Sequence, residues 1–173
     1  MLKNKKRIII FVIIFLFVTA ICISPIVQFL YVSSWKYQVE DFEMYEKDFQ
    51  LMVDFTRDYF KSNETSQDIN NTLHTGYDTL SKEYTLWNNN GKIEISENVQ
   101  NSLNTIVRKA FNKKSDSNFH KIIYNNDKIC FEIDNGQYGL VYTFDGKKPH
   151  FDNIDKKVYT KRIKENWYHV LIK

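Results

Sequence analysis

The side chains that are able to perform chemistry are few in this chain. It holds 173 residues with two cysteines and four histidines. Cys22 lies inside an apolar run, so only Cys130 is placed to act as an external nucleophile, and no disulfide between the two is proposed. An apolar setting raises the pKa of a thiol and lowers its reactivity, and the strand register predicted below places Cys130 between Ile123 and Val141. We therefore expect Cys130 to be a packed residue.

The histidines and acids form no recognisable site. The histidines show no zinc-site spacing; they are His74, His120, His150 and His169. The acidic pairs Glu40/Asp41 and Asp152/Asp155 resemble ordinary solvated surface pairs. With five glycines, the chain has no phosphate loop and no nucleophile elbow. We predict no catalytic residue, no metal, no cofactor and no enzymatic activity, and keep an envelope-acting hydrolase as a less favoured alternative.

The clearest chemical signal is an uneven distribution of charge. Residues 33–68 carry nine acids and four bases, whereas residues 104–173 carry fourteen bases and eight acids. The predicted binding surface consists of cations in the last part of the chain: Lys147, Lys148, Lys156, Lys157, Lys161, Arg162 and Lys164. Such a surface suits an acidic protein, an anionic wall polymer or lipid headgroups. The basic pI comes from the first seven residues, so we predict no nucleic-acid partner.

An apolar segment near the N-terminus predicts a membrane anchor. Residues 8–32 carry no charge and follow a basic tail at residues 1–7. As a helix they span roughly 37 Å, which exceeds a bilayer core of about 30 Å. Because basic flanks stay on the cytoplasmic side, we expect a signal-anchor with the N-terminus inside and residues 33–173 outside the cell. The expected partner of residues 8–32 is therefore the lipid bilayer.

Two other readings of this segment stay open. A cleaved signal peptide is compatible with the small residues at 18–20. Lipidation at Cys22 is disfavoured because Ile21 stands where a small residue is needed. The many Lys and Asn residues are typical of a bacterium with AT-rich coding.

The exposed part is expected to begin with helices. Residues 35–61 lack Gly and Pro and carry aromatic residues at helical spacing, which predicts a long amphipathic helix continuing out of the anchor. Residues 69–87 repeat apolar residues at helical spacing and predict two short helices. A short strand at 92–95 and a helix capped by Ser96 follow.

The last third alternates apolar and polar residues. The predicted strands are 119–124, 129–133, 137–144, 158–163 and 167–172, and Asn135-Gly136 is a favoured hairpin turn. The turn pairs Ile133 with Tyr138, and the preceding hairpin sets Lys121 opposite Glu132. The expected fold class is α+β: an N-terminal transmembrane helix continuing into a long amphipathic helix, then short helices and an antiparallel meander of about five strands.

These observations predict a single-pass, extracytoplasmic binding or interaction protein of the bacterial cell envelope. Its favoured partner is an envelope protein, because the chain shows a compact domain and a lysine-rich half without a catalytic motif. The alternative is a ligand-cradling sensory domain, which requires a mixed apolar and polar pocket between the long helix and the sheet.

Overall fold

The computed structural model describes residues 39, 41–63, 71–111, 119–133, 138–151 and 155–172. The fold described below is that of the compact unit formed by residues 37–173. Its elements, in chain order, are α2 (Phe42–Ser62), β1 (Thr72–Asp78), β2 (Glu83–Asn88), β3 (Gly91–Lys92), α3 (Glu97–Thr105), the π-helical turn η1 (Ile106–Ala110), β4 (Phe119–Tyr124), β5 (Lys128–Ile133), β6 (Tyr138–Thr143), β7 (Val158–Arg162) and β8 (Trp167–Ile172).

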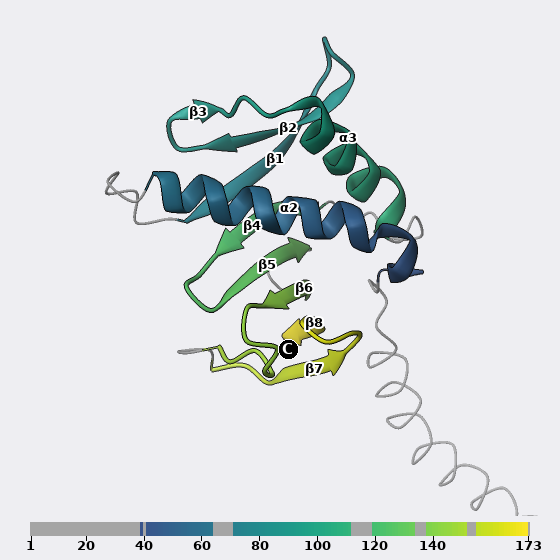
Figure 1. Cartoon of the computed structure of the whole chain (residues 1–173), viewed down its shortest axis with the longest axis vertical. Coiled ribbons are helices and arrows are strands. Elements are labelled where there is room, and N and C mark those ends of the chain that lie inside the picture. The colour runs from purple at the N-terminus through teal and green to yellow at the C-terminus, as the bar shows by residue number, and fades with distance from the viewer. Residues whose placement is uncertain are drawn as a thin grey trace, which may run out of the picture. The chain divides into compact units, whose positions relative to one another are not determined.

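The strands form one antiparallel sheet of eight, in the order β3-β2-β1-β4-β5-β6-β8-β7. Helix α2 crosses one face of this sheet and α3 lies beside it (Figure 1). A hydrogen bond of 2.7 Å from Ser102 Oγ on α3 to Asp48 Oδ1 on α2 joins the two helices. The sheet thus has a face covered by α2 and α3, called the covered face below, and an opposite reverse face.

The prediction for the long helix is confirmed from Phe42 onward, and its predicted continuation toward residue 35 is wrong. Val39 forms an isolated bridge with Phe111, and Asp41 has a φ of 54°, in the left-handed region. Such a residue interrupts a right-handed helix, so α2 begins at Phe42. Its apolar side packs on the sheet, and Phe49, Met52 and Val53 are fully buried.

The predicted helices at 69–87 are wrong, because this segment forms β1 and β2. Thr, Tyr and Trp residues occupy many of its positions and favour strands over helices. Strand β1 pairs with β4, setting Leu73 opposite Ile122, and Leu86 of β2 is also fully buried. The position of Gly76 supports this pairing, since a Cβ there would lie 3.2 Å from the Trp87 indole nitrogen.

The predicted pairing of the later strands is confirmed in detail. Ile133 pairs with Tyr138, and Lys121 pairs with Glu132, with 3.0 Å between Nζ and Oε1. The Asn135-Gly136 turn lies outside the described residues. Ser96 also caps α3 as predicted, by accepting a hydrogen bond from the Val99 N–H.

The fold-class prediction as a whole is nevertheless wrong. The sheet has eight strands, and β1, β2 and β3 precede α3. The last strands also depart from a meander, because β8 pairs with β6 and leaves β7 outermost. The described helices are α2 and α3, the latter ending in η1.

The membrane prediction needs correction as well. No helix in the described part of the chain is long and apolar enough to cross a bilayer. Helix α2 has the length, but it carries eight charged side chains. For the described residues this finding contradicts the predicted single-pass, signal-anchored localisation. The predicted tail at 1–7 and anchor at 8–32 lie outside the described residues.

Candidate functional site

Most of the predicted binding cations gather at one edge of the sheet. Lys161 and Arg162 belong to β7, and Lys156, Lys157 and Lys164 flank that strand. β7 is the last strand in the sheet order, and no described strand pairs with its outer side (Figure 1). Strand order therefore places these charges on an open edge, which we call the β7 edge.

Lys147 and Lys148 lie in the turn that follows β6. This turn approaches the β7–β8 hairpin, because the Tyr168 hydroxyl donates a hydrogen bond of 2.7 Å to the Gly146 carbonyl oxygen. Lys147 is engaged by Asp145, whose Oδ2 lies 3.2 Å from its Nζ. The Lys147 N–H also holds the pKa of Asp145 below its ordinary value. The predicted set thus includes two lysines that lie beside the edge strand and not on it.

The outward backbone groups of β7 follow from its pairing. The Ile163 N–H donates a 2.9 Å hydrogen bond to the Trp167 carbonyl, so this pair is hydrogen-bonded to β8. Bonded and non-bonded pairs alternate along an antiparallel ladder. Val158, Thr160 and Arg162 therefore direct their N–H and C=O groups away from β8, toward the open side.

The two faces of β7 differ in chemistry. Tyr159 and Lys161 lie on the covered face, and the Lys157 ammonium nitrogen joins them at 5.1 Å from the Tyr159 ring centroid. Val158 and Thr160 lie on the reverse face, where Val158 packs against the small cluster of Cys130, Val141 and Val170. One side of the edge is thus basic and aromatic. The other is apolar and hydroxylated at Val158 and Thr160, and it ends in Arg162, which lies over the Tyr168 ring.

Some of the cations are already engaged. Lys164 contacts Glu46 of α2 at 2.6 Å, and this hydrogen bond raises the pKa of the lysine. Arg162 donates hydrogen bonds to the carbonyl oxygens of Lys164 and Glu165 and lies over the Tyr168 ring. Lys156, Lys157 and Lys161 are exposed, and no described acid lies within ion-pair distance of them. These three lysines are the cations most available to a partner.

A hollow of about 460 Å³ lies beside this edge, between the first turn of α2 and the β7–β8 hairpin. Asp41 and Glu43 line it together with Lys161 and Arg162, so opposite charges balance there. The unbalanced positive charge of the edge consequently lies toward Lys156 and Lys157, at the beginning of β7.

The opposite edge of the sheet ends in the two-residue strand β3, and α3 covers the part of β2 that β3 leaves unpaired. The Tyr84 N–H donates to Asn104 Oδ1 at 3.0 Å, and the Tyr84 carbonyl accepts from Gln100 Nε2 at 2.6 Å. The Leu86 carbonyl accepts from the Ile93 N–H, and β3 pairs with the remainder of β2. Side-chain amides thus occupy the outward backbone groups of β2 that another chain would otherwise pair with.

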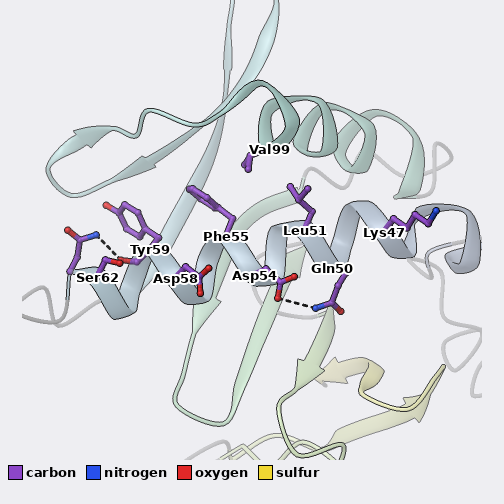
Figure 2. Close-up of a pocket in the computed structure, with 10 residues that line it drawn as sticks. Lys47, Gln50, Leu51, Asp54, Phe55, Asp58, Tyr59, Ser62 and Val99 are labelled. Atoms are coloured by element: carbon purple, nitrogen blue, oxygen red, sulfur yellow. Dashed lines mark hydrogen bonds between the residues drawn. The ribbon is translucent and has the colours of Figure 1, made fainter.

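A second surface is a groove of about 770 Å³ along the side of α2 that faces α3 (Figure 2). Leu51, Phe55 and Tyr59 line it with Val99 of α3. The Asn88 amide donates a hydrogen bond of 2.6 Å to the Tyr59 hydroxyl. Asp54 and Asp58 also line the groove, and Arg57 lies 3.0 and 3.5 Å from these two carboxylates. We call it the α2 groove.

The pocket that the ligand-cradling alternative requires is not where it was predicted. Between α2 and the centre of the sheet, the fully buried side chains of Phe49, Met52 and Phe131 fill the space. The α2 groove lies instead on the α3 side of the helix. Its apolar residues on α2, Leu51, Phe55 and Tyr59, recur at four-residue intervals in the sequence, and this spacing is the signal that indicates a second apolar side of the helix.

Cys130 is packed as predicted, and burial raises the pKa of its thiol to about 12. His169 is buried on β8, and burial lowers the pKa of its imidazole to about 4, with a smaller contribution from Lys161. His74 and His150 are exposed elsewhere, and the side chain of His120 lies outside the description. Within the described ranges, no three His, Cys, Asp or Glu side chains are arranged to hold a metal.

Comparisons of this chain with family models, with curated proteins and with solved structures find no match.

Proposed function

We propose that the folded part of this chain is a non-catalytic binding module that contacts an acidic protein through the β7 edge. The observation that carries this proposal is the contrast in backbone coverage: α3 closes one edge of the sheet, and the lysine-rich edge is open. An uncovered strand edge offers directional hydrogen bonds to a partner.

Charge supports the same surface. Residues 155–165 carry five cations and two acids. Lysines at a strand edge also have a general protective role, since they discourage edge-to-edge aggregation. A negatively charged partner meets no such barrier, because the lysines attract it and steer its approach. Positively charged partners are repelled by the same lysines.

A site-specific crosslinking experiment tests this proposal. A photoreactive residue replaces Lys161 in one full-length variant and Leu80 in a control. Leu80 is 95% exposed and lies in the turn between β1 and β2, outside the β7 edge. We expect a specific protein neighbour from position 161 and none from position 80.

Charge reversal provides the second arm. The variant Lys156→Glu/Lys157→Glu is expected to abolish the crosslink from position 161. The matched control Lys47→Glu/Lys61→Glu changes net charge equally on exposed positions of α2. A crosslink that survives the first variant, or that disappears equally in both, would show that the β7 edge is not the contact surface.

The α2 groove supports a second candidate, a ligand-binding sensory role. Its volume falls within the range of about 300–1,000 Å³ that is usual for small-molecule sites. The aromatic rings of Phe55 and Tyr59 stack with centroids 6.0 Å apart, and the carboxylates of Asp54 and Asp58 lie beside them. This combination suits an aromatic or alkyl group that carries a cationic or hydrogen-bonding substituent.

A fragment screen by NMR tests the sensory role on the full-length protein. Fragments with an aromatic ring and an amine are expected to shift the amides of Phe55, Tyr59 and Val99. The variant Leu51→Asp should remove these shifts while leaving the sheet amides unchanged. Shifts confined to other regions would exclude the α2 groove.

A further inference from the structure

We infer that the partner docks as an extended strand, added to the outer side of β7, whose acidic side chains alternate with β-branched ones. This inference rests on the proposed function and specifies how the partner is recognised. It follows from the direction of the backbone groups, from the two faces of β7 and from the position of the unbalanced charge.

The backbone provides the first element of recognition. Val158, Thr160 and Arg162 present their N–H and C=O groups on the open side. β7 is a strand of five residues, so an added strand of about the same length would satisfy these groups. Strand addition of this kind supplies affinity through main-chain hydrogen bonds, whatever the partner's side chains are.

The two faces provide specificity. Side chains of an added strand alternate between the covered and the reverse face. On the covered side they meet Lys157, Tyr159 and Lys161, which favour Glu or Asp. On the reverse side they meet Val158 and Thr160, which favour Val, Ile or Thr. Arg162, at the end of that face, already donates hydrogen bonds to the Lys164 and Glu165 carbonyl oxygens. An alternating acidic and β-branched segment therefore fits, whereas a block of acids followed by a block of apolar residues does not.

The charge pattern also indicates where the acids matter most. Asp41 and Glu43 balance Lys161 and Arg162 near the end of β7, whereas no described acid pairs with Lys157 near its beginning. We expect Lys157→Glu to weaken binding more than Lys161→Glu. The reverse order would contradict the conclusion that the unbalanced charge lies at the beginning of β7.

A second copy of this chain is a less suitable occupant. Antiparallel pairing of two β7 strands centred on Tyr159 would set Lys157 of one copy opposite Lys161 of the other. Like charges opposite each other destabilise a strand pair. Charge thus selects an acidic strand over self-association.

The test uses the full-length protein and a synthetic peptide of about seven residues, in which Glu alternates with Val and both ends are blocked. Its control has the same composition, with the Glu and Val residues in separate blocks. We expect the alternating peptide to bind more than about tenfold tighter and to protect the Thr160 and Arg162 amides from hydrogen exchange.

Thr160→Pro isolates the backbone contribution. The Thr160 N–H faces the open side, so proline there removes no hydrogen bond within the sheet, and the extended conformation before it is compatible with proline. We expect this variant to fold and to lose more than about tenfold in affinity for the alternating peptide, whereas Thr160→Val retains it. Circular dichroism and urea unfolding check that both variants are folded.

The outcomes separate this inference from the proposed function. Strand addition is wrong if Thr160→Pro binds the alternating peptide as tightly as Thr160→Val, or if neither peptide binds the native protein. In both cases the crosslink from position 161 still decides the proposed function. If Thr160→Pro instead dissolves a dimer that forms without peptide, the occupant is a second copy and the inference is overturned. If Thr160→Pro does not fold, protection of the Thr160 and Arg162 amides in the native protein decides alone.

Discussion

The two faces of the sheet are built in different ways. The covered face has an aromatic core, in which the Phe49 ring lies 5.3 to 5.9 Å from the rings of Phe42, Phe111, Phe131 and Trp167. The reverse face has a small cluster of Cys130, Val141 and Val170, with Phe151 from the β6–β7 connection packed against it. Ion pairs and exposed polar groups surround this cluster, among them Lys121 with Glu132.

This difference indicates where stability and recognition lie. Large buried rings contribute most to the free energy of unfolding, because each removes a large apolar area from water. The reverse face and the β7 edge bury less apolar area, so a substitution there should lower the free energy of unfolding less than one in the aromatic core. The proposed binding surface therefore lies next to the part of the fold that is most sensitive to substitution.

The largest expected effect is the loss of the central ring of the covered face. Phe49→Ala should lower the free energy of unfolding by about 3–5 kcal/mol, because it leaves a cavity among four other rings. Urea unfolding followed by circular dichroism measures this change. Met44→Ala, at a 72% exposed position of the same helix, is the control and should change stability by less than about 0.5 kcal/mol. Equal effects of the two variants would contradict the contrast between buried core and surface.

The second effect is a dependence of stability on pH that arises from His169. This residue lies on the covered face opposite Leu140, and the pKa of its imidazole is about 4, below the ordinary value of 6.5. The folded state therefore binds fewer protons than the unfolded state between these values. Stability from this group is complete above pH 6.5, falls as the pH drops toward 4, and changes no further below it.

Burial makes this effect measurable, since His169 is 3% exposed. Its upper bound is about 3–4 kcal/mol, because the shift from 6.5 to about 4 is multiplied by about 1.4 kcal/mol for each pKa unit. Urea unfolding at several pH values should show a slope that His169→Gln removes and His150→Gln, at an exposed position, retains. The same slope in all three proteins would mean that His169 is not its source.

A smaller loss is expected on the reverse face. Val170→Ala should cost about 2 kcal/mol, because the cluster around Cys130 is small and relaxes more readily than a ring core. In a Cys22→Ser background, Cys130 is the only thiol and reports opening of this face through its rate of alkylation. Val170→Ala should accelerate labelling, whereas Lys148→Ala should not. If Cys130 of the protein without Val170→Ala is alkylated as fast as it is in the unfolded chain, the reverse face is already open.

The same contrast explains which parts of the fold were predictable. In β5, Ile129, Phe131 and Ile133 alternate with polar or smaller residues and stand next to specific turn residues, so local sequence determines both strand and register. In β1 and β2, the residues Leu73, Tyr77, Leu80 and Tyr84 mimic helical spacing. Yet Leu80 is 95% exposed in a turn, so this periodicity did not mark a buried face.

The strand character of β1 depends on its partner β4, far along the chain, and single-sequence patterns do not contain such a contact. The proposed binding surface was predictable to a similar extent. The charges of Lys156, Lys157 and Lys161 are evident in the sequence, whereas their position on an open edge depends on β8 pairing with β6. Closure of the other edge by Gln100 and Asn104 also depends on this tertiary arrangement.

The smallest expected effect is a gain in stability on the covered face. Thr56 of α2 is fully buried, and its Oγ1 forms no hydrogen bond within the described part of the chain. Thr56→Val keeps the β-branched shape and removes an unsatisfied buried hydroxyl, so it should raise the free energy of unfolding by about 1 kcal/mol.

Thr75→Val is the matched control, because the Thr75 hydroxyl donates a 2.6 Å hydrogen bond to the Phe119 carbonyl and its loss should cost about 1 kcal/mol. Urea unfolding measures both changes. A gain in stability for Thr56→Val and a loss for Thr75→Val would show that hydrogen bonding, and not hydroxyl burial alone, determines which polar groups the covered face tolerates. A loss of stability in both variants would mean that the Thr56 hydroxyl does have a partner.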